Sequence, residues 1–218
     1  MTNKVLLFDI DHTLFNTDLY LEKVFNLLAR HVDDSEKDKV LVKAWEIYGQ
    51  IRKVGVFRPH HFAHMFVTQL ARDRDTQQII DVLEDSQLLT SCIYKDVYST
   101  LEILSSIDGL ALGIFSSGDT KFQLAKIATI QKFFSEKDIH IYPFKDIEIP
   151  TILKQYEKTQ NFMVDDLLRV LYETKKQNPS VKTIWMNRNP QNEQNAIQDA
   201  FKADYTISHI SEVLPLMS

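Results

Sequence analysis

The chain has 218 residues, a length that allows one large domain or one domain carrying an insertion. Hydrophobic residues make up 44% of the sequence and charged residues 25%, which excludes disordered and low-complexity proteins. The 5 glycines and 6 prolines are about half of average usage, which disfavours turn-dense sandwiches and barrels. The net charge is −5 without a long block of either sign, so we expect no nucleic-acid partner.

The cysteine content and the apolar segments bear on the compartment. The single cysteine, Cys92, excludes an intramolecular disulfide, and we interpret it as a packing residue. Asp9 interrupts the first apolar run too early for the core of a signal peptide. No apolar stretch approaches the roughly 20 residues that span a membrane. We therefore expect a soluble cytoplasmic protein without a membrane partner, present as a monomer or a weak dimer.

A recurring apolar pattern predicts buried strands. Residues 4–8 form a continuous apolar run that ends at Asp9, as is typical of a strand with both faces buried. Similar runs occupy residues 110–115, 161–164 and 183–186, and weaker ones occupy 139–142 and 205–207. Helical patterns lie between them, at residues 122–130, 149–158, 167–177 and 210–216. Strands that alternate with helices predict a parallel α/β sheet.

Residues 18 to about 90 carry a different pattern, without a strand-like run. Apolar side chains recur there at helical spacing. The stripes are Leu21, Val24, Phe25 and Leu28; Leu41, Ala44, Tyr48 and Ile51; Phe62, Met65, Phe66 and Leu70; and Ile79 with Leu83. A bundle of about four helices that interrupts the α/β pattern after its first strand indicates an insertion. We therefore predict a core domain from residues 1–16 and 91–218 and an inserted helical domain from residues 17–90.

Hydroxyl and carboxylate side chains follow several of the predicted strands. In an open parallel sheet, the carboxyl ends of the strands meet at one edge, where functional groups gather. Carboxylates brought together there repel one another unless a cation lies between them. Oxygen ligands without Cys or His favour a hard ion such as Mg²⁺. The residues are Asp9, Asp11 and Thr13 after the first strand, Ser116 and Ser117 after the second, and Asp165 and Asp166 after a later one.

Three segments carry a resemblance to a known family. FDIDHTLFNT, residues 8–17, resembles the D-x-D-x-T signature of the haloacid dehalogenase-like (HAD) phosphohydrolases. IFSSGD, residues 114–119, resembles their second motif, a strand ending in Ser or Thr, and FMVDD, residues 162–166, resembles their acidic fourth motif. The helical insertion resembles the cap placed after the first motif. The resemblance implies a Rossmann-like core with a parallel sheet and an inserted α-helical cap.

The resemblance also implies a magnesium-dependent phosphatase with a covalent intermediate. Asp9 would attack phosphorus and become an aspartyl phosphate. Asp11 would protonate the leaving oxygen and then deprotonate the water that hydrolyses the intermediate. The metal would be bound by the Asp9 side chain, the Asp11 backbone carbonyl and Asp166, with Asp165 as a direct ligand or an outer neighbour. Positioning and charge neutralisation would supply most of the catalysis, because nucleophile and phosphate are both anionic.

The phosphate-binding group is expected to combine hydroxyls with a lysine. Ser116 would bind phosphate oxygens together with Ser117 and Thr13. The two serines are also suited to cap the following helix, and Thr13 is suited to stabilise the turn. His12 stands where Gly is common in the family, and its role is open.

The lysine departs from the family pattern, which often shows Lys-Pro about two dozen residues before the acidic pair. This chain has no Lys-Pro. We choose Lys145, which lies 20 residues before Asp165 and ahead of a predicted helix. Lys154 inside that helix and Lys137 before a weak strand remain alternatives.

Basic residues and histidines of the insertion are candidates for contact with ligands. Arg52, Lys53 and Arg58 lie in a segment that joins two predicted helices. We hypothesise that one of them contacts the non-reacting part of the substrate, and a solvated charged loop is the alternative. His60 and His64 share a helix face, but no acidic third ligand is apparent nearby, so we interpret them as solvated or packed.

The sequence thus predicts a phosphatase acting on a small phosphorylated metabolite, because the insertion would limit access for large substrates. A phosphomutase of the same fold is the alternative, since it also needs Asp9 and Asp11. A noncatalytic relative that retains the fold for binding is another. A dehalogenase is disfavoured because that chemistry needs neither Asp11 nor a metal.

Overall fold

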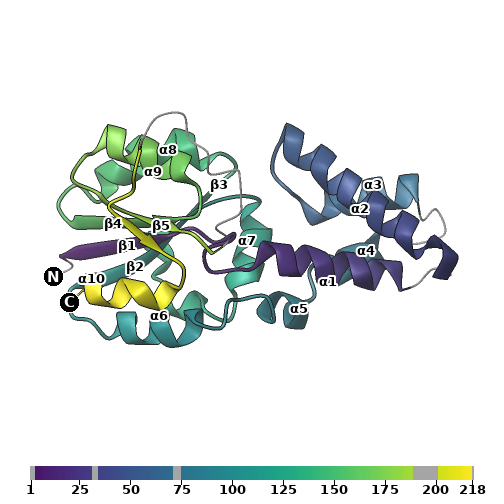
Figure 1. The fold of residues 1–218 in the computed structure, drawn as a ribbon, viewed down its shortest axis with the longest axis horizontal. Helices are drawn as coiled ribbons and strands as arrows, with labels where there is room; N and C mark the ends of the chain where they lie inside the picture. Colours follow the sequence, from purple (N-terminus) through teal and green to yellow (C-terminus); the bar gives the residue numbers. More distant parts are fainter. Residues whose placement is uncertain (1–2, 31–33, 71–74, 189–200, 218) are drawn as a thin grey trace.

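A parallel sheet organises the larger part of the molecule. The computed structural model describes residues 3–30, 34–70, 75–188 and 201–217. In this part of the chain the sheet has six strands, all paired in parallel, in the order β3-β2-β1-β4-β5-β6 (Figure 1). The strands are β1 (Lys4–Phe8), β2 (Leu110–Ser117), β3 (Ile139–Tyr142), β4 (Gln160–Asp165), β5 (Lys182–Met186) and β6 (Tyr205–Ile207). The predicted parallel α/β sheet is confirmed.

Helices cover both faces of this sheet, which explains why β1 is apolar from Val5 to Phe8 (Figure 1). Val5 and Leu7 belong to one buried cluster with side chains of α8 and α9, whereas Leu6 and Phe8 belong to another with side chains of α6, α7 and α10. Burial of each such side chain contributes about 1.5–3 kcal/mol. The helices are α6 (Val97–Ser105), α7 (Thr120–Ile127), α8 (Lys145–Gln155), α9 (Leu168–Gln177) and α10 (Leu214–Met217), with 3₁₀ turns at Gln131–Phe133, Glu136–Asp138 and Ile210–Val213.

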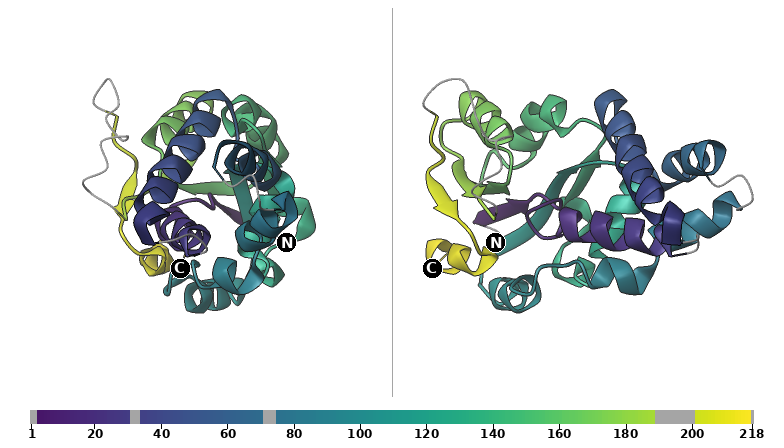
Figure 2. Two further views of the ribbon diagram at one scale, coloured as in Figure 1. Left: turned by 90° about the vertical axis from the view of Figure 1, so that its right-hand side faces the viewer. Right: turned by 45° about the vertical axis from the view of Figure 1, so that its right-hand side comes forward.

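Five further helices lie together beyond the carboxyl end of β1 and form what we call the helical part (Figures 1 and 2). They are α1 (Thr17–Ala29), α2 (Asp34–Val54), α3 (Pro59–Gln69), α4 (Thr76–Leu83) and α5 (Ser86–Thr90). Aromatic rings fill its interior: Phe25 stacks on Phe62 with ring centroids 5.5 Å apart, and Trp45 meets Phe25 edge-on at 4.9 Å. The domain boundaries at residues 16/17 and 90/91 stay a prediction.

The buried side chains of the helical part are continuous with those under the sheet. One cluster runs from Val24, Phe25 and Phe62 through Phe122 to Leu101, so it contains residues of α1, α3, α6 and α7. Phe57 and Phe122 approach with ring centroids 5.5 Å apart, which places an aromatic contact at the junction. The two parts therefore share a single hydrophobic core rather than two separate ones.

Several boundaries differ from the sequence prediction. β2 extends through Ser116 and Ser117, so neither serine caps a helix. The N-cap of α7 is Asp119, whose side chain accepts a hydrogen bond from the Phe122 N–H at 3.1 Å. α8 begins at Lys145 rather than at 149, and α6 was not predicted, although Val97, Leu101 and Leu104 are buried at helical spacing. None of the helices in the described ranges combines the length and apolar composition needed to cross a bilayer.

Candidate active site

Three neighbouring strands bring the candidate site together. β1 lies between β2 and β4, with Phe8 in register with Ile114 on one side and Val164 on the other. The residues that follow these positions therefore meet at the carboxyl edge of the sheet. The Asp9 N–H donates to the Val164 carbonyl at 2.9 Å, which continues the ladder one residue past β1 and fixes where the Asp9 side chain starts.

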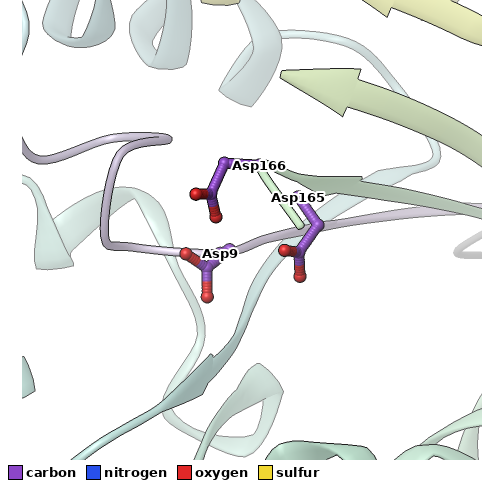
Figure 3. A group of neighbouring side chains, drawn as sticks. All are labelled: Asp9, Asp165 and Asp166. Atoms are coloured by element: carbon purple, nitrogen blue, oxygen red, sulfur yellow. The ribbon is translucent and has the colours of Figure 1, made fainter. Parts of the chain in front are cut away.

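Three carboxyl groups gather at this edge. Asp9, Asp165 and Asp166 each offer an oxygen, and these oxygens all lie within 4.8 Å of one another (Figure 3). Asp9 and Asp165 are buried and Asp166 is half-buried. The strand order brings together two segments that are more than 150 residues apart in the chain, as the sequence predicted from their positions at strand ends.

Lys145 lies against two of these carboxylates. Its ammonium donates to Asp9 and to Asp165 Oδ2, the latter at 2.6 Å, and only 2% of the side chain is exposed. Burial alone would lower the pKa of Lys145, but the charges of Asp165 and Asp9 raise it above its usual range. Lys137 and Lys154 are both exposed, so the structure brings Lys145 and neither alternative to the site.

The carboxylates at this edge outnumber the positive charge beside them. Burial, opposed by the Lys145 charge and reinforced by the Asp9 charge, raises the pKa of Asp165 to about 7. Burial and the charges of Asp9 and Asp165 likewise raise the pKa of Asp166 well above its usual range. An additional cation would relieve this repulsion, and the donors are all oxygens. The residues present therefore fit a hard divalent ion such as Mg²⁺.

The two serines of β2 hold other residues of the site in place. Ser116 is buried, and its hydroxyl donates to Asp9 Oδ1 at 3.0 Å. The Lys145 hydrogen bond goes to the same oxygen, so both donors hold Oδ1. The Ser117 hydroxyl accepts from the Lys145 backbone N–H at 3.2 Å, which ties the start of α8 to the end of β2. Ser117 lines the cavity and Ser116 does not.

The Asp11 carboxylate lies apart from the three-carboxylate group. It accepts hydrogen bonds from the Thr17 hydroxyl, from Lys126 Nζ at 2.6 Å and from Gln123 Nε2 at 2.8 Å. Burial would raise the pKa of Asp11, but the Lys126 charge and these hydrogen bonds hold it well below its usual range. Asp11 is therefore an ionised carboxylate, held between the first residue of α1 and two residues of α7.

Lys126 and Gln123 were not identified as site residues from the sequence. Lys126 falls within the apolar stripe of α7, and its ammonium lies 5.0 Å from the centre of the Phe122 ring and 5.2 Å from that of Phe15. Lys126 and Gln123 are both buried. The sequence did contain one signal: Lys126 occupies an apolar position of the helix that follows the second motif. A lysine buried at such a position needs a charged partner, which would have pointed to a carboxylate nearby.

A tight loop connects β1 to the helical part. His12 adopts a left-handed conformation with φ 57°, which explains the preference for Gly at this position. Arg188, another residue that the sequence analysis missed, donates to the Thr13 carbonyl from Nε at 3.1 Å. Thr13 is buried, its hydroxyl has no partner among the described residues, and the side chain does not line the cavity. The structure thus leaves its proposed phosphate contact without support.

A cavity of about 970 Å³ opens above the carboxylates and extends to the helical part. Arg52 and Lys53 line it, as their predicted role requires. Arg58 does not; it points its guanidinium at Asp119, with 3.7 Å between Nε and Oδ2. From the sheet side the lining includes Asp9, Asp11, Ser117, Lys145 and Asp166, and from the helical part it includes Trp45, Tyr48 and Phe57.

The histidines of the helical part are solvated. His60, His61 and His64 are exposed, and none of them belongs to a three-residue cluster of metal-binding type in the described part of the chain. Cys92 is buried, and burial raises the pKa of its thiol, as suits a packing residue.

No protein-family model matches the sequence, and a search of curated proteins gave no match. Solved structures do match. A protein described as a haloacid dehalogenase-like hydrolase from Burkholderia xenovorans is 22% identical with a TM-score of 0.80, over 99% of this chain and 97% of that one. The magnesium-bound HAD-hydrolase YfnB from Bacillus subtilis is 15% identical with a TM-score of 0.61, over 100% and 99% of the two chains.

A third structure is that of L-2-haloacid dehalogenase from Xanthobacter autotrophicus with chloropropionic acid covalently bound. It is 14% identical with a TM-score of 0.60, over 99% of this chain and 98% of that one. Identities at this level establish architecture and leave the reaction to be argued from the site. The resemblance inferred from the three motifs is confirmed at the level of architecture: this chain has the fold of the haloacid dehalogenase-like hydrolases.

Proposed function

We propose that the protein is a magnesium-dependent phosphoric monoester hydrolase that acts on a small phosphorylated metabolite through an aspartyl phosphate on Asp9. The observation that carries this proposal is the cluster of Asp9, Asp165 and Asp166, whose oxygens lie within 4.8 Å of one another and two of whose members pair with Lys145. Dehalogenation needs one nucleophilic carboxylate and no metal. A surplus of buried carboxylates favours phosphoryl transfer, which depends on a cation to bring two anions together.

The side chains of Asp9, Asp165 and Asp166, together with the Asp11 backbone carbonyl, would hold Mg²⁺. When bound, the ion would neutralise charge on the phosphate oxygens and on the attacking carboxylate. The Lys145 ammonium supports the same electrostatic task from the other side of Asp9, because it is buried and fully charged.

Asp9 is oriented for nucleophilic attack. Ser116 and Lys145 both donate to Oδ1, so Oδ2 is the oxygen that would attack phosphorus in line. The bond from phosphorus to the leaving oxygen breaks as the new bond to Asp9 forms. In the second half-reaction, water attacks the same phosphorus and Asp9 leaves as a free carboxylate.

Asp11 would move the protons of the two half-reactions. The ionised state that Lys126 imposes suits the second one, in which Asp11 takes a proton from the attacking water. The first half-reaction needs a proton on the leaving oxygen. Asp11 must therefore take up a proton when its carboxylate leaves Lys126 and turns toward the substrate. Esters with acidic leaving groups avoid this requirement, and we expect aryl phosphates to be hydrolysed faster than alkyl phosphates.

The test is phosphate release from a panel of small phosphate esters, with and without Mg²⁺. Asp9→Asn should lower kcat by at least about 1,000-fold because it removes the nucleophile. Asp146→Asn is the matched control, since Asp146 lines the same cavity but pairs with Arg169. Isomerised sugar phosphate without phosphate release would assign a mutase instead. Chloride release from 2-chloropropionate without Mg²⁺ would overturn the proposal.

A further inference from the structure

The charged residues that line the cavity are not paired equally. On the sheet side every lining cation has a carboxylate partner: Lys145 has Asp9 and Asp165, Lys126 has Asp11, and Arg169 has Asp146. Arg52 and Lys53 line the same cavity from the helical part, and their side chains form no ion pair or hydrogen bond with any described residue. Two positive charges therefore face the cavity without a compensating group from the protein.

These two residues belong to the helical part, whereas Asp9 belongs to the sheet side of the cavity. Both lie in the last turn of α2, which in Figure 1 runs from the far end of the helical part back toward the sheet. The volume of about 970 Å³ is far larger than one phosphate group needs and is at the upper end of cavities that hold small molecules. A ligand with its phosphate at Asp9 therefore has room to extend toward α2.

Aromatic side chains also line the cavity. Trp45, Tyr48 and Phe57 line it from the helical part, and Phe144 lines it from the loop before α8. Trp45 is 45% exposed and Phe144 is 59% exposed, so both present ring surface that the protein itself does not cover. Such surface suits the carbon skeleton of a ligand rather than a further charge.

We propose that the substrate is a phosphate monoester with a second anionic group, a carboxylate or another phosphate, at the end remote from the ester, and that Arg52 and Lys53 bind this group. The inference rests on the proposed function, because it takes the Asp9 end of the cavity as the reacting end. Arginine and lysine both donate to such oxygens, and their attraction is strengthened when a ligand displaces water from the cavity.

A structural role for the two residues makes a different prediction. Basic side chains in the last turn of a helix stabilise it through the helix dipole. That contribution is the same whichever substrate is present. Discrimination between esters that differ only in the remote group therefore separates recognition from helix stabilisation.

The experiment compares wild type with the double variant Arg52→Gln/Lys53→Gln on two pairs of esters. The first pair is 3-phosphoglycerate and glycerol 3-phosphate, which differ in a carboxylate. The second is fructose 1,6-bisphosphate and fructose 1-phosphate, which differ in a phosphate. For the pair whose remote group is recognised, we expect KM of the doubly anionic member to rise about 10- to 100-fold and KM of the other to change less than about threefold. The matched control is Lys39→Gln/Lys43→Gln, which removes one exposed and one half-buried charge of α2 outside the cavity.

Binding measured without turnover keeps this inference distinct from the proposed function. In an Asp9→Asn background, calorimetry with the same esters should show the same selective loss of affinity when Arg52 and Lys53 are replaced. Equal affinities for both members of each pair, or equal losses for both, would overturn the inference even if wild type releases phosphate. Absence of phosphate release by wild type from every ester would overturn the proposed function, and the inference would fall with it.

Discussion

The two walls of the cavity differ in how their charged side chains are paired. On the sheet side, buried cations and carboxylates hold one another, as Lys145 does with Asp9 and Lys126 does with Asp11. On the side of the helical part, Arg52 and Lys53 are exposed and have no described partner. Fixed, paired groups suit a reaction that is the same for every substrate, whereas unpaired groups suit the choice of substrate. The predictions below test this division.

The largest effect is expected from Lys145→Met. It leaves Asp9 and Asp165 buried without their shared cation, so the free energy of unfolding should fall by about 3–5 kcal/mol in the presence of a chelator. Urea denaturation measures the change. Lys154→Met, an exposed position in the same helix, is the control and should change stability by less than about 0.5 kcal/mol. Equal losses for the two variants would contradict the inference that Lys145 neutralises the buried carboxylates of Asp9 and Asp165.

Magnesium should stabilise the protein through the carboxylate cluster. At a concentration of 100 times its Kd, Mg²⁺ should add about 2.7 kcal/mol to the free energy of unfolding. Asp166→Asn should remove most of this gain, while Asp146→Asn should keep it. Thermal melting with increasing Mg²⁺ gives the comparison. A wild-type Tm that does not respond to Mg²⁺ would argue against the metal site.

Lys126→Met should change the pH dependence of activity. Loss of the ammonium raises the pKa of Asp11, and burial raises it further, so the pH below which Asp11 becomes protonated moves upward. Because the second half-reaction needs ionised Asp11, hydrolysis of the aspartyl phosphate should slow about tenfold at pH 6 and much less at pH 8, as measured by kcat on an ester for which this step limits turnover. Lys126→Arg should restore the profile in part. Lys121→Met, which removes an exposed lysine of the same helix, is the control. If the pH profile of Lys126→Met is identical to that of wild type, Lys126 does not set the ionisation of Asp11.

Arg58→Gln should have the smallest effect. Arg58 is exposed, pairs with Asp119 and does not itself line the cavity, so stability should change by less than about 1 kcal/mol. KM should stay within about twofold of wild type for every ester. A selective rise in KM for doubly anionic esters would show that Arg58 also contributes to substrate recognition. Recognition would then not be confined to the unpaired cations of α2.

The sequence predicted the positions that depend on strand ends. Asp9 and Asp165 could be placed together because buried apolar runs and the rule for parallel sheets fix where their strands finish. Lys145 required a choice among three lysines, since its place depends on where α8 begins. Lys126 could not be placed, because its partner is reached only through the packing of α7 against Phe15.

The same reasoning explains the other omissions. Arg188 meets the Thr13 carbonyl because β5 ends beside the loop after β1, a distance of 175 residues along the chain. α6 was missed because Thr100 interrupts its apolar stripe with a polar side chain, which the structure satisfies by a hydrogen bond to the Asp96 carbonyl at 2.6 Å. The Arg188 contact follows from tertiary packing rather than from local pattern.

The aromatic contact between Phe57 and Phe122 joins the helical part to the α/β part, so the two parts should unfold together. Since Phe62 and Leu101 belong to one continuous cluster of buried side chains, loosening one end should expose the other to water. Calorimetry should therefore record a single endotherm with matching calorimetric and van't Hoff enthalpies. A protease that cuts within the helical part should destroy the whole molecule instead of releasing a durable α/β fragment.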